Sequence, residues 1–301
     1  MKLYAPIYYK DFKCIADRCR HSCCVSWEID VDEDALLRYK SLGDAGKKIL
    51  ESIDFESDFP HFRLLPGGRC PHLDKSGLCR IISEHGEKYL CHICREHPRF
   101  FNTVSSRCEV GLGAVCEEAA RLILQTENYT ELCLIGEIEA ESCDAEFDVL
   151  SERSEVFSLL SDSSHSYNDR LLLLYENYGI SPNNLTDVEW REIIGSLEYL
   201  SEKSRDKFLS YSSTPKISLK SEEYLERALA YFIFRHTGSA LSRSEFVLGL
   251  GLSLFLERLF ASLLSFEKKH DVESAAMLLR LVSEEIEYSE DNTESIKFAF
   301  L

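Results

Sequence analysis

Cysteine is absent from more than half of this 301-residue chain, because all twelve cysteines lie between Cys14 and Cys143. Proline is scarce at 7 residues, glycine is ordinary at 14, and the sequence contains neither a low-complexity tract nor an internal repeat of fixed period. Since 45% of the residues are hydrophobic, the chain can bury a substantial core, and disorder is not expected. The composition predicts a folded chain whose N-terminal part holds all the thiols.

Long uninterrupted apolar runs are also missing. The most hydrophobic segment, 246–264, is broken by Glu257 and Arg258, so its apolar part is too short to span a bilayer and predicts a buried helix. The opening residues, MKLYAPIYYKDFKC, contain no continuous apolar stretch, so no signal peptide is predicted. We therefore expect a soluble cytoplasmic protein with no membrane partner, in which disulfides are disfavoured.

Positive charge is in short supply as well. The chain has 34 Lys and Arg against 52 Asp and Glu, a formal net charge of −18. Phosphate binding needs a basic surface, so no nucleic-acid partner is expected. The window from Pro60 to Arg107 is an exception, because it carries more basic than acidic residues and is rich in cysteine. Arginines near a four-thiolate iron–sulfur centre would offset its negative charge.

Hydrophobic periodicity predicts a mainly α fold with two domains. Residues 1–140 are expected to form a cysteine-rich, loop-rich metal-binding domain, which packs on a helical bundle formed by residues 141–301. Strand-type alternation is scarce, apart from a short extended piece near residues 62–65. The expected helices are 33–53, with N-cap candidates among Asp30, Asp32 and Asp34, and 117–125, 147–160, 168–178, 186–211, 221–236, 244–266 and 271–288.

The cysteines form two groups, C-x4-C-x3-C-C from Cys14 to Cys24 and a second group from Cys70 to Cys94. Thiolates ligate both iron–sulfur clusters and structural zinc, so two such groups predict a metal centre closed by distant segments. Side chains of adjacent residues diverge, and the Cys23 and Cys24 sulfurs are not expected to share one zinc ion. Histidine could complete a zinc site, with His72 and His97 as the candidates.

These blocks resemble the flagellin lysine-N-methylase family, which is related to small cysteine-rich proteins that chelate zinc or iron. The first block reads Y-x2-F-x-C and C-x3-CC-x2-W-x2-D, and the second contains CPHL, LCRI and the C-x3-PR end at Arg99. Ser26 stands where a glycine is common in the family, and Tyr288 where a histidine commonly follows the glutamate. The matching segments are 9–30, 70–99, 116–122, 225–236 and 285–292.

The resemblance implies a methyltransferase that uses S-adenosyl-L-methionine (SAM) and a [4Fe-4S] cluster to methylate lysines of flagellin. Zinc in place of iron, a non-enzymatic chelating protein, and a metal-braced scaffold for a partner remain alternatives. Four thiolates suffice for one cluster, so either half of the matching cysteines ligate or a second metal is present. The implied metal ligands are Cys14, Cys19, Cys23, Cys24, Cys70, Cys79, Cys94 and Cys116.

A lysine amine must lose its proton before it attacks a methyl sulfonium, so the site needs a base and groups that attract lysine. The acidic C-terminal part suits a lysine-bearing protein substrate. Glu285 and Glu287 are the predicted lysine-binding or basic catalytic groups, and Tyr288 is predicted to hydrogen-bond the amine. The predicted cofactor-binding residues are Arg99, Arg235 and His236, with Arg235 facing the cluster or the SAM carboxylate.

Overall fold

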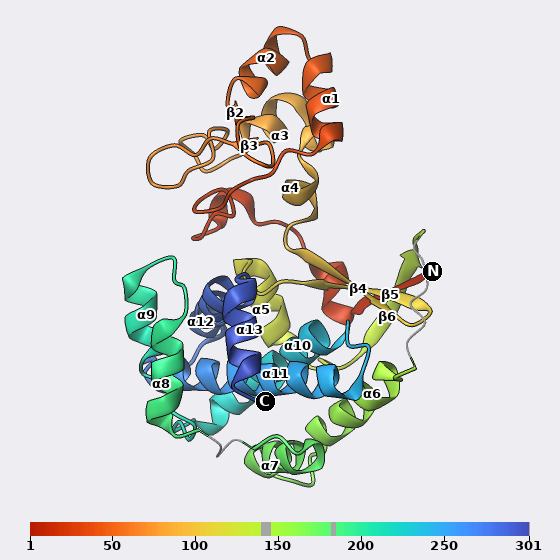
Figure 1. Ribbon diagram of the computed structural model, residues 1–301, viewed down its shortest axis with the longest axis vertical. Coiled ribbons are helices and arrows are strands. Elements are labelled where there is room, and N and C mark those ends of the chain that lie inside the picture. Colours follow the sequence, from red (N-terminus) through yellow and green to blue (C-terminus); the bar gives the residue numbers. More distant parts are fainter. Residues whose placement is uncertain (140–145, 182–184, 301) are drawn as a thin grey trace. The chain divides into compact units, whose positions relative to one another are not determined.

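The computed structural model describes residues 1–139, 146–181 and 185–300, and its helices make the protein mainly α, as predicted (Figure 1). The chain divides into two compact units. Unit 1 comprises residues 1–12 and 100–301, and unit 2 comprises residues 13–99. The predicted boundary between residues 140 and 141 lies outside the described residues and stays a prediction.

Unit 1 contains a mixed sheet that the sequence did not predict. The strand order is β4-β5-β1-β6, and β1 runs parallel to β5 and antiparallel to β6. The central strand β5 is buried along almost its whole length, so it lacks the polar–apolar alternation that marks a half-exposed strand. The strands are β1 (Lys2–Pro6), β4 (Arg99–Val104), β5 (Arg107–Leu112) and β6 (Leu132–Glu137), and the 3-10 helix η1 (Ile7–Asp11) follows β1.

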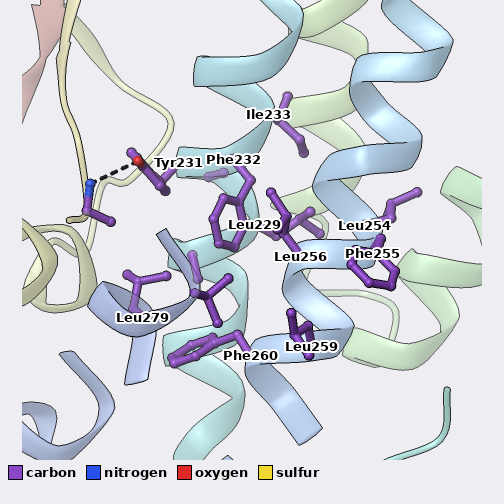
Figure 2. Close-up of a cluster of buried hydrophobic side chains, with 14 of the residues drawn as sticks. Leu229, Tyr231, Phe232, Ile233, Leu254, Phe255, Leu256, Leu259, Phe260 and Leu279 are labelled. Atoms are coloured by element: carbon purple, nitrogen blue, oxygen red, sulfur yellow. Dashed lines mark hydrogen bonds between the residues drawn. The ribbon is translucent and has the colours of Figure 1, made fainter. Parts of the chain in front are cut away.

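The remainder of unit 1 is helical. Its helices are α5 (Glu117–Gln125), α6 (Val149–Leu160), α7 (Tyr167–Tyr178), α8 (Asp187–Ser196), α9 (Glu202–Phe208), α10 (Leu219–Thr237), α11 (Arg243–Ser265), α12 (Val272–Val282) and α13 (Glu290–Phe298). Helices α10 and α11 lie side by side, and their apolar side chains form the centre of the core together with Leu279 of α12 (Figure 2). By length and composition alone α11 could cross a bilayer, but 89% of its most apolar window is buried inside the protein, as in a core helix.

Two predicted helices of unit 1 are divided. The prediction of one helix over 186–211 was wrong, because α8 ends at Ser196 and α9 begins after Ser201, whose side chain caps it. The predicted helix 271–288 ends earlier as an α-helix, at Val282. It continues as the π-helix η4 (Ser283–Glu287), and Ser289 then caps α13, which was not predicted.

Unit 2 has short elements and a small core. Asp32 caps α1 as predicted, since its side chain accepts a hydrogen bond from Ala35 N. The predicted helix 33–53 is broken at Gly43, whose φ of 62° lies outside the helical region. The elements are η2 (Ala16–Arg18), α1 (Glu33–Ser41), α2 (Asp44–Leu50), β2 (Ile53–Asp54), β3 (His61–Phe62), α3 (Arg80–His85), η3 (Glu87–Tyr89) and α4 (His92–Glu96).

Candidate functional site

A buried group of charged and phenolic side chains in unit 1, here called the Glu287 cluster, joins four of the predicted site residues. Arg235 and His236 lie near the end of α10, and Glu287 and Tyr288 lie at the end of the π-helix η4. Tyr231, one turn before Arg235 on α10, completes the cluster. A π-helix is rare and is often found at functional sites, where its wider turn redirects side chains.

The carboxylate of Glu287 is the centre of this cluster. Its Oε1 lies 2.7 Å from His236 Nε2 and 3.2 Å from Arg235 Nε. Its Oε2 accepts a hydrogen bond of 2.9 Å from the Tyr231 hydroxyl. The Glu287 side chain has no exposed surface, so these partners replace water around a buried charge.

The partners of Glu287 decide its ionisation. Burial alone would raise the pKa of Glu287, but the positive charge of Arg235 and the hydrogen bond from His236 outweigh it and lower the pKa to about 2. Burial lowers the pKa of His236, and Glu287 opposes this only in part. At neutral pH the cluster therefore combines an ionised carboxylate, a charged guanidinium and a neutral imidazole.

Arg235 and Tyr231 connect the cluster to other elements of unit 1. The Arg235 guanidinium lies over the rings of Phe100, at 4.7 Å, and Tyr288, at 4.9 Å. The Tyr231 hydroxyl also accepts a hydrogen bond of 2.9 Å from Ala114 N in the loop between β5 and α5 (Figure 2, dashed line). Because Arg235 and Tyr231 each contact more than one element, the cluster is held from the sheet side and the helix side.

The other predicted catalytic carboxylate, Glu285, lies in a different setting. Its Oε2 accepts a hydrogen bond of 2.8 Å from Leu200 N in the loop between α8 and α9. Asn292 holds the same loop, with hydrogen bonds to both backbone groups of Glu198 and to the carbonyl of Glu285. Burial raises the pKa of Glu285. Glu285 and Glu287 therefore have separate partners: the first anchors a loop and the second holds the charged groups of α10.

Unit 2 contains a second group of chemically reactive side chains, here called the thiol cluster: Cys24, Cys70, Cys79, Cys91 and Cys94. They come from three segments of the chain and belong to one apolar core or pack against it. Burial, together with the charges of Cys24, Cys79 and Cys91, raises the pKa of Cys70 to about 12. The pKa of Cys94 is raised by its hydrogen bond with Cys91 and by burial. The five thiols are therefore electrostatic neighbours.

The remaining predicted metal ligands are not part of the core that holds the thiol cluster, although Cys23 forms a hydrogen bond with Cys24. Cys14 and Cys23 are exposed, Cys19 donates its thiol hydrogen to the carbonyl of His21 at 2.7 Å, and Cys116 is the N-cap residue of α5 in unit 1. Within residues 1–139, 146–181 and 185–300, no three His, Cys, Asp or Glu side chains meet where they could share a metal ion. The thiol cluster fits iron or zinc by donor type, but no metal geometry is formed, so the metal centre stays a prediction.

The predicted histidine candidates and Arg99 also belong to unit 2. Burial lowers the pKa of both His72 and His97 to about 4, so both rings are neutral at pH 7, the form that binds metals. The His72 ring packs edge-on against Phe62, with ring centres 4.7 Å apart. Arg99 donates a hydrogen bond of 3.4 Å to the carbonyl of Arg95.

Sequence reasoning missed two residues, Cys91 and Tyr231. Cys91 is not one of the eight cysteines that match the resembled family, here called the eight-cysteine pattern. It is nevertheless buried, and its sulfur lies 3.2 Å from the hydroxyl of Tyr39. The C-x2-C spacing with Cys94 was the available signal. Tyr231 precedes Arg235 by four residues, a spacing that places both on one helical face, but a tyrosine within an apolar helix gives no signal of its own.

Parts of the chain are similar to known proteins. A stretch of 126 residues, 40% of the chain, is 29% identical to the lysine-N-methylases of Salmonella choleraesuis strain SC-B67 and Salmonella typhimurium strain LT2, and spans 31% of their length. A stretch of 161 residues, 51% of the chain, is 27% identical to the flagellar biosynthetic protein FliU of Salmonella muenchen and spans 94% of it. No protein-family model and no solved structure matches the chain. The predicted resemblance to lysine-N-methylases is confirmed.

Proposed function

We propose that this protein is a cytoplasmic SAM-dependent N-methyltransferase that modifies lysine side chains of a protein, with flagellin as its substrate. The observation that carries the proposal is the 29% identity to two lysine-N-methylases. Similarity to a flagellar biosynthetic protein supports flagellin as the substrate. SAM as the methyl donor rests on the resemblance alone, because no glycine-rich nucleotide motif is complete in the sequence.

The Glu287 cluster is the proposed reaction site. A carboxylate with a pKa of about 2 takes up a proton poorly at neutral pH, so Glu287 acts as a fixed negative charge that orients its partners. Arg235, whose side chain is 14% exposed, is the group that would bind the carboxylate of the methyl donor. Tyr288 lies against Arg235, where its hydroxyl would hydrogen-bond the substrate amine.

We propose further that the thiol cluster holds a metal, a [4Fe-4S] cluster with zinc as the alternative. Support comes from the donor type, the mutual proximity of five thiols and their shared apolar surroundings. Four of the five, Cys24, Cys70, Cys79 and Cys94, belong to the eight-cysteine pattern, and Cys91 is the additional candidate. When bound, the metal would cross-link loops that have little regular structure of their own.

The decisive experiment is co-expression with flagellin, followed by intact-mass measurement of flagellin. We expect mass increases of about 14 Da per methyl group, and their loss in the Arg235→Ala variant but not in Glu294→Ala, a control on the exposed face of α13. Flagellin that stays unmodified beside a folded wild-type protein contradicts the proposal.

Iron, sulfide and zinc analysis of the same preparation tests the metal. A colourless zinc protein without transferase activity supports the second candidate, a chelating protein, which the thiol cluster favours.

A further inference from the structure

The hydrogen bond between Glu287 and His236 determines which imidazole nitrogen carries a proton. An ionised carboxylate can only accept hydrogen bonds, and Glu287 Oε1 lies 2.7 Å from His236 Nε2. The neutral ring must therefore place its hydrogen on Nε2, which leaves the lone pair on Nδ1. Tyr231 and Arg235 hold the same carboxylate in place, so the orientation of the ring is supported from two further directions.

The imidazole of His236 keeps contact with solvent, although its partner does not. Its side chain is 11% exposed, whereas that of Glu287 is fully buried. Nδ1 has no hydrogen-bond partner among the described residues. It is also absent from the fully buried side-chain nitrogens of these residues that lack a partner, so part of its surface is accessible to solvent. The charged groups that act most strongly on the ring are Glu287, Arg235 and Lys297 of α13. Nδ1 therefore carries a lone pair that a substrate group could reach.

We propose that His236 is the base of the methyltransferase: its Nδ1 removes the proton from the substrate lysine, and Glu287 and Tyr231 are positioning residues that set its tautomer. The inference rests on the proposed function and deepens it, because it assigns to His236 a role different from the cofactor contact predicted from the sequence. A carboxylate that holds one ring nitrogen so that the other acts as the base is also found in other enzymes, there with the two nitrogens exchanged.

The proton transfer is balanced within the site. One ammonium N–H bond of lysine breaks, its electron pair stays on the amine, and the Nδ1 lone pair forms the new N–H bond. The resulting imidazolium is stabilised by the carboxylate of Glu287 and afterwards releases its proton to water. In water the transfer is uphill by about four pKa units, and the lowered pKa of His236 adds to this difference. The lysine must therefore be desolvated on binding, which lowers its pKa.

The test compares His236→Gln with the wild type. Glutamine can donate a hydrogen bond to Glu287 but offers no basic lone pair, so we expect kcat to fall by a factor of about 10² to 10⁴, with KM for the methyl donor unchanged. In the wild type, log kcat should rise with pH through the pKa of His236, and this limb should vanish in the variant. His165→Gln is the matched control, because His165 forms a histidine–carboxylate pair with Asp162 at 2.8 Å on the exposed surface.

The tautomer is measured separately from the activity. In long-range proton–nitrogen spectra of histidine-labelled protein, we expect His236 to carry its hydrogen on Nε2 in the wild type and to lose this preference in Glu287→Gln. A hydrogen on Nδ1, or a His236→Gln variant that folds and retains both kcat and the acidic limb, overturns the inference. A wild type that methylates nothing contradicts the proposed function instead. Glu287→Gln, which leaves the imidazole intact, covers the case in which His236→Gln does not fold, because an unchanged tautomer together with an unchanged kcat in that variant also overturns the inference.

Discussion

The two compact units bury their polar groups in different ways. In unit 1, the buried carboxylates of Glu109, Glu257 and Glu287 each contact an arginine, as in the 2.8 Å hydrogen bond from Arg153 to Glu109. In unit 2, the thiols of the thiol cluster lie beside one another, and Cys91 pairs with the Tyr39 hydroxyl. Unit 1 balances its buried charges with its own residues. Unit 2, in contrast, collects donors that a cation could join, and any metal dependence should be confined to it.

Metal removal is the strongest test of this contrast. Treatment with a chelator under reducing conditions should unfold unit 2 and leave unit 1 folded, because structural metals contribute roughly 10 kcal/mol to folding. Hydrogen exchange of peptides from 13–99 and 100–301 separates the two responses. Cys94→Ser should reproduce the loss, whereas Cys108→Ser, at a buried cysteine of unit 1, should not. Equal protection of both units after metal removal would disprove the contrast.

Glu287→Ala tests the self-sufficiency of unit 1. The substitution leaves Arg235 buried without its counter-charge and His236 without its hydrogen-bond partner, so we expect a loss of about 3–5 kcal/mol in the free energy of unfolding. Urea denaturation measures it. Glu294→Ala removes an exposed ion pair with Lys297 on α13 and should change stability little. Similar midpoints for the two variants would show that the Glu287 cluster does not stabilise unit 1.

Acid should reveal the same cluster in the wild type. The pKa of Glu287 is lowered to about 2 from its ordinary 4.5, so its contribution is complete above about pH 5 and disappears as the pH falls towards 2. It amounts to no more than about 3 kcal/mol. The lowered pKa of His236 acts in the same direction, because the unfolded chain takes up its proton first as the pH falls. Urea denaturation measures the difference in stability between wild type and Glu287→Gln from pH 6 to pH 3, about the range over which these groups titrate. The advantage of the wild type should shrink steadily as the pH falls. A constant difference contradicts the assignment.

Ser26→Gly is the smallest expected effect and concerns unit 2 alone. Ser26 adopts a φ of 68°, a conformation that glycine reaches without strain, which explains why glycine is common there in the resembled family. We expect a stabilisation of about 1 kcal/mol. Gly68→Ala is the opposite change, because a Cβ there would lie 3.1 Å from the Ser26 backbone at a φ of 70°. Thermal unfolding of unit 2, followed by hydrogen exchange, should move in opposite directions for the two variants.

Local signals predicted the elements that depend on neighbouring residues. The helix over 117–125 has the predicted bounds in α5, and Asp32 caps α1 as expected. The division of residues 186–211 was missed because Ser201 lies within a continuous apolar pattern. In the sequence alone, a serine that caps a helix there cannot be told from a serine inside the helix. The sheet was missed because β5 is buried on both sides and β1 meets it only through a pairing distant in sequence.

For the candidate site, the sequence by itself determined the residue types: thiols in the N-terminal part, and Arg235, His236 and Glu287 on apolar helices. Only the tertiary structure decided the partners. It separated Glu285 from Glu287, added Tyr231 and Cys91, and assigned Cys116 to unit 1. The physical reason is that a helical or cysteine pattern reports local periodicity and chemistry, whereas the pKa and hydrogen-bond partner of a buried group depend on residues brought together from distant segments.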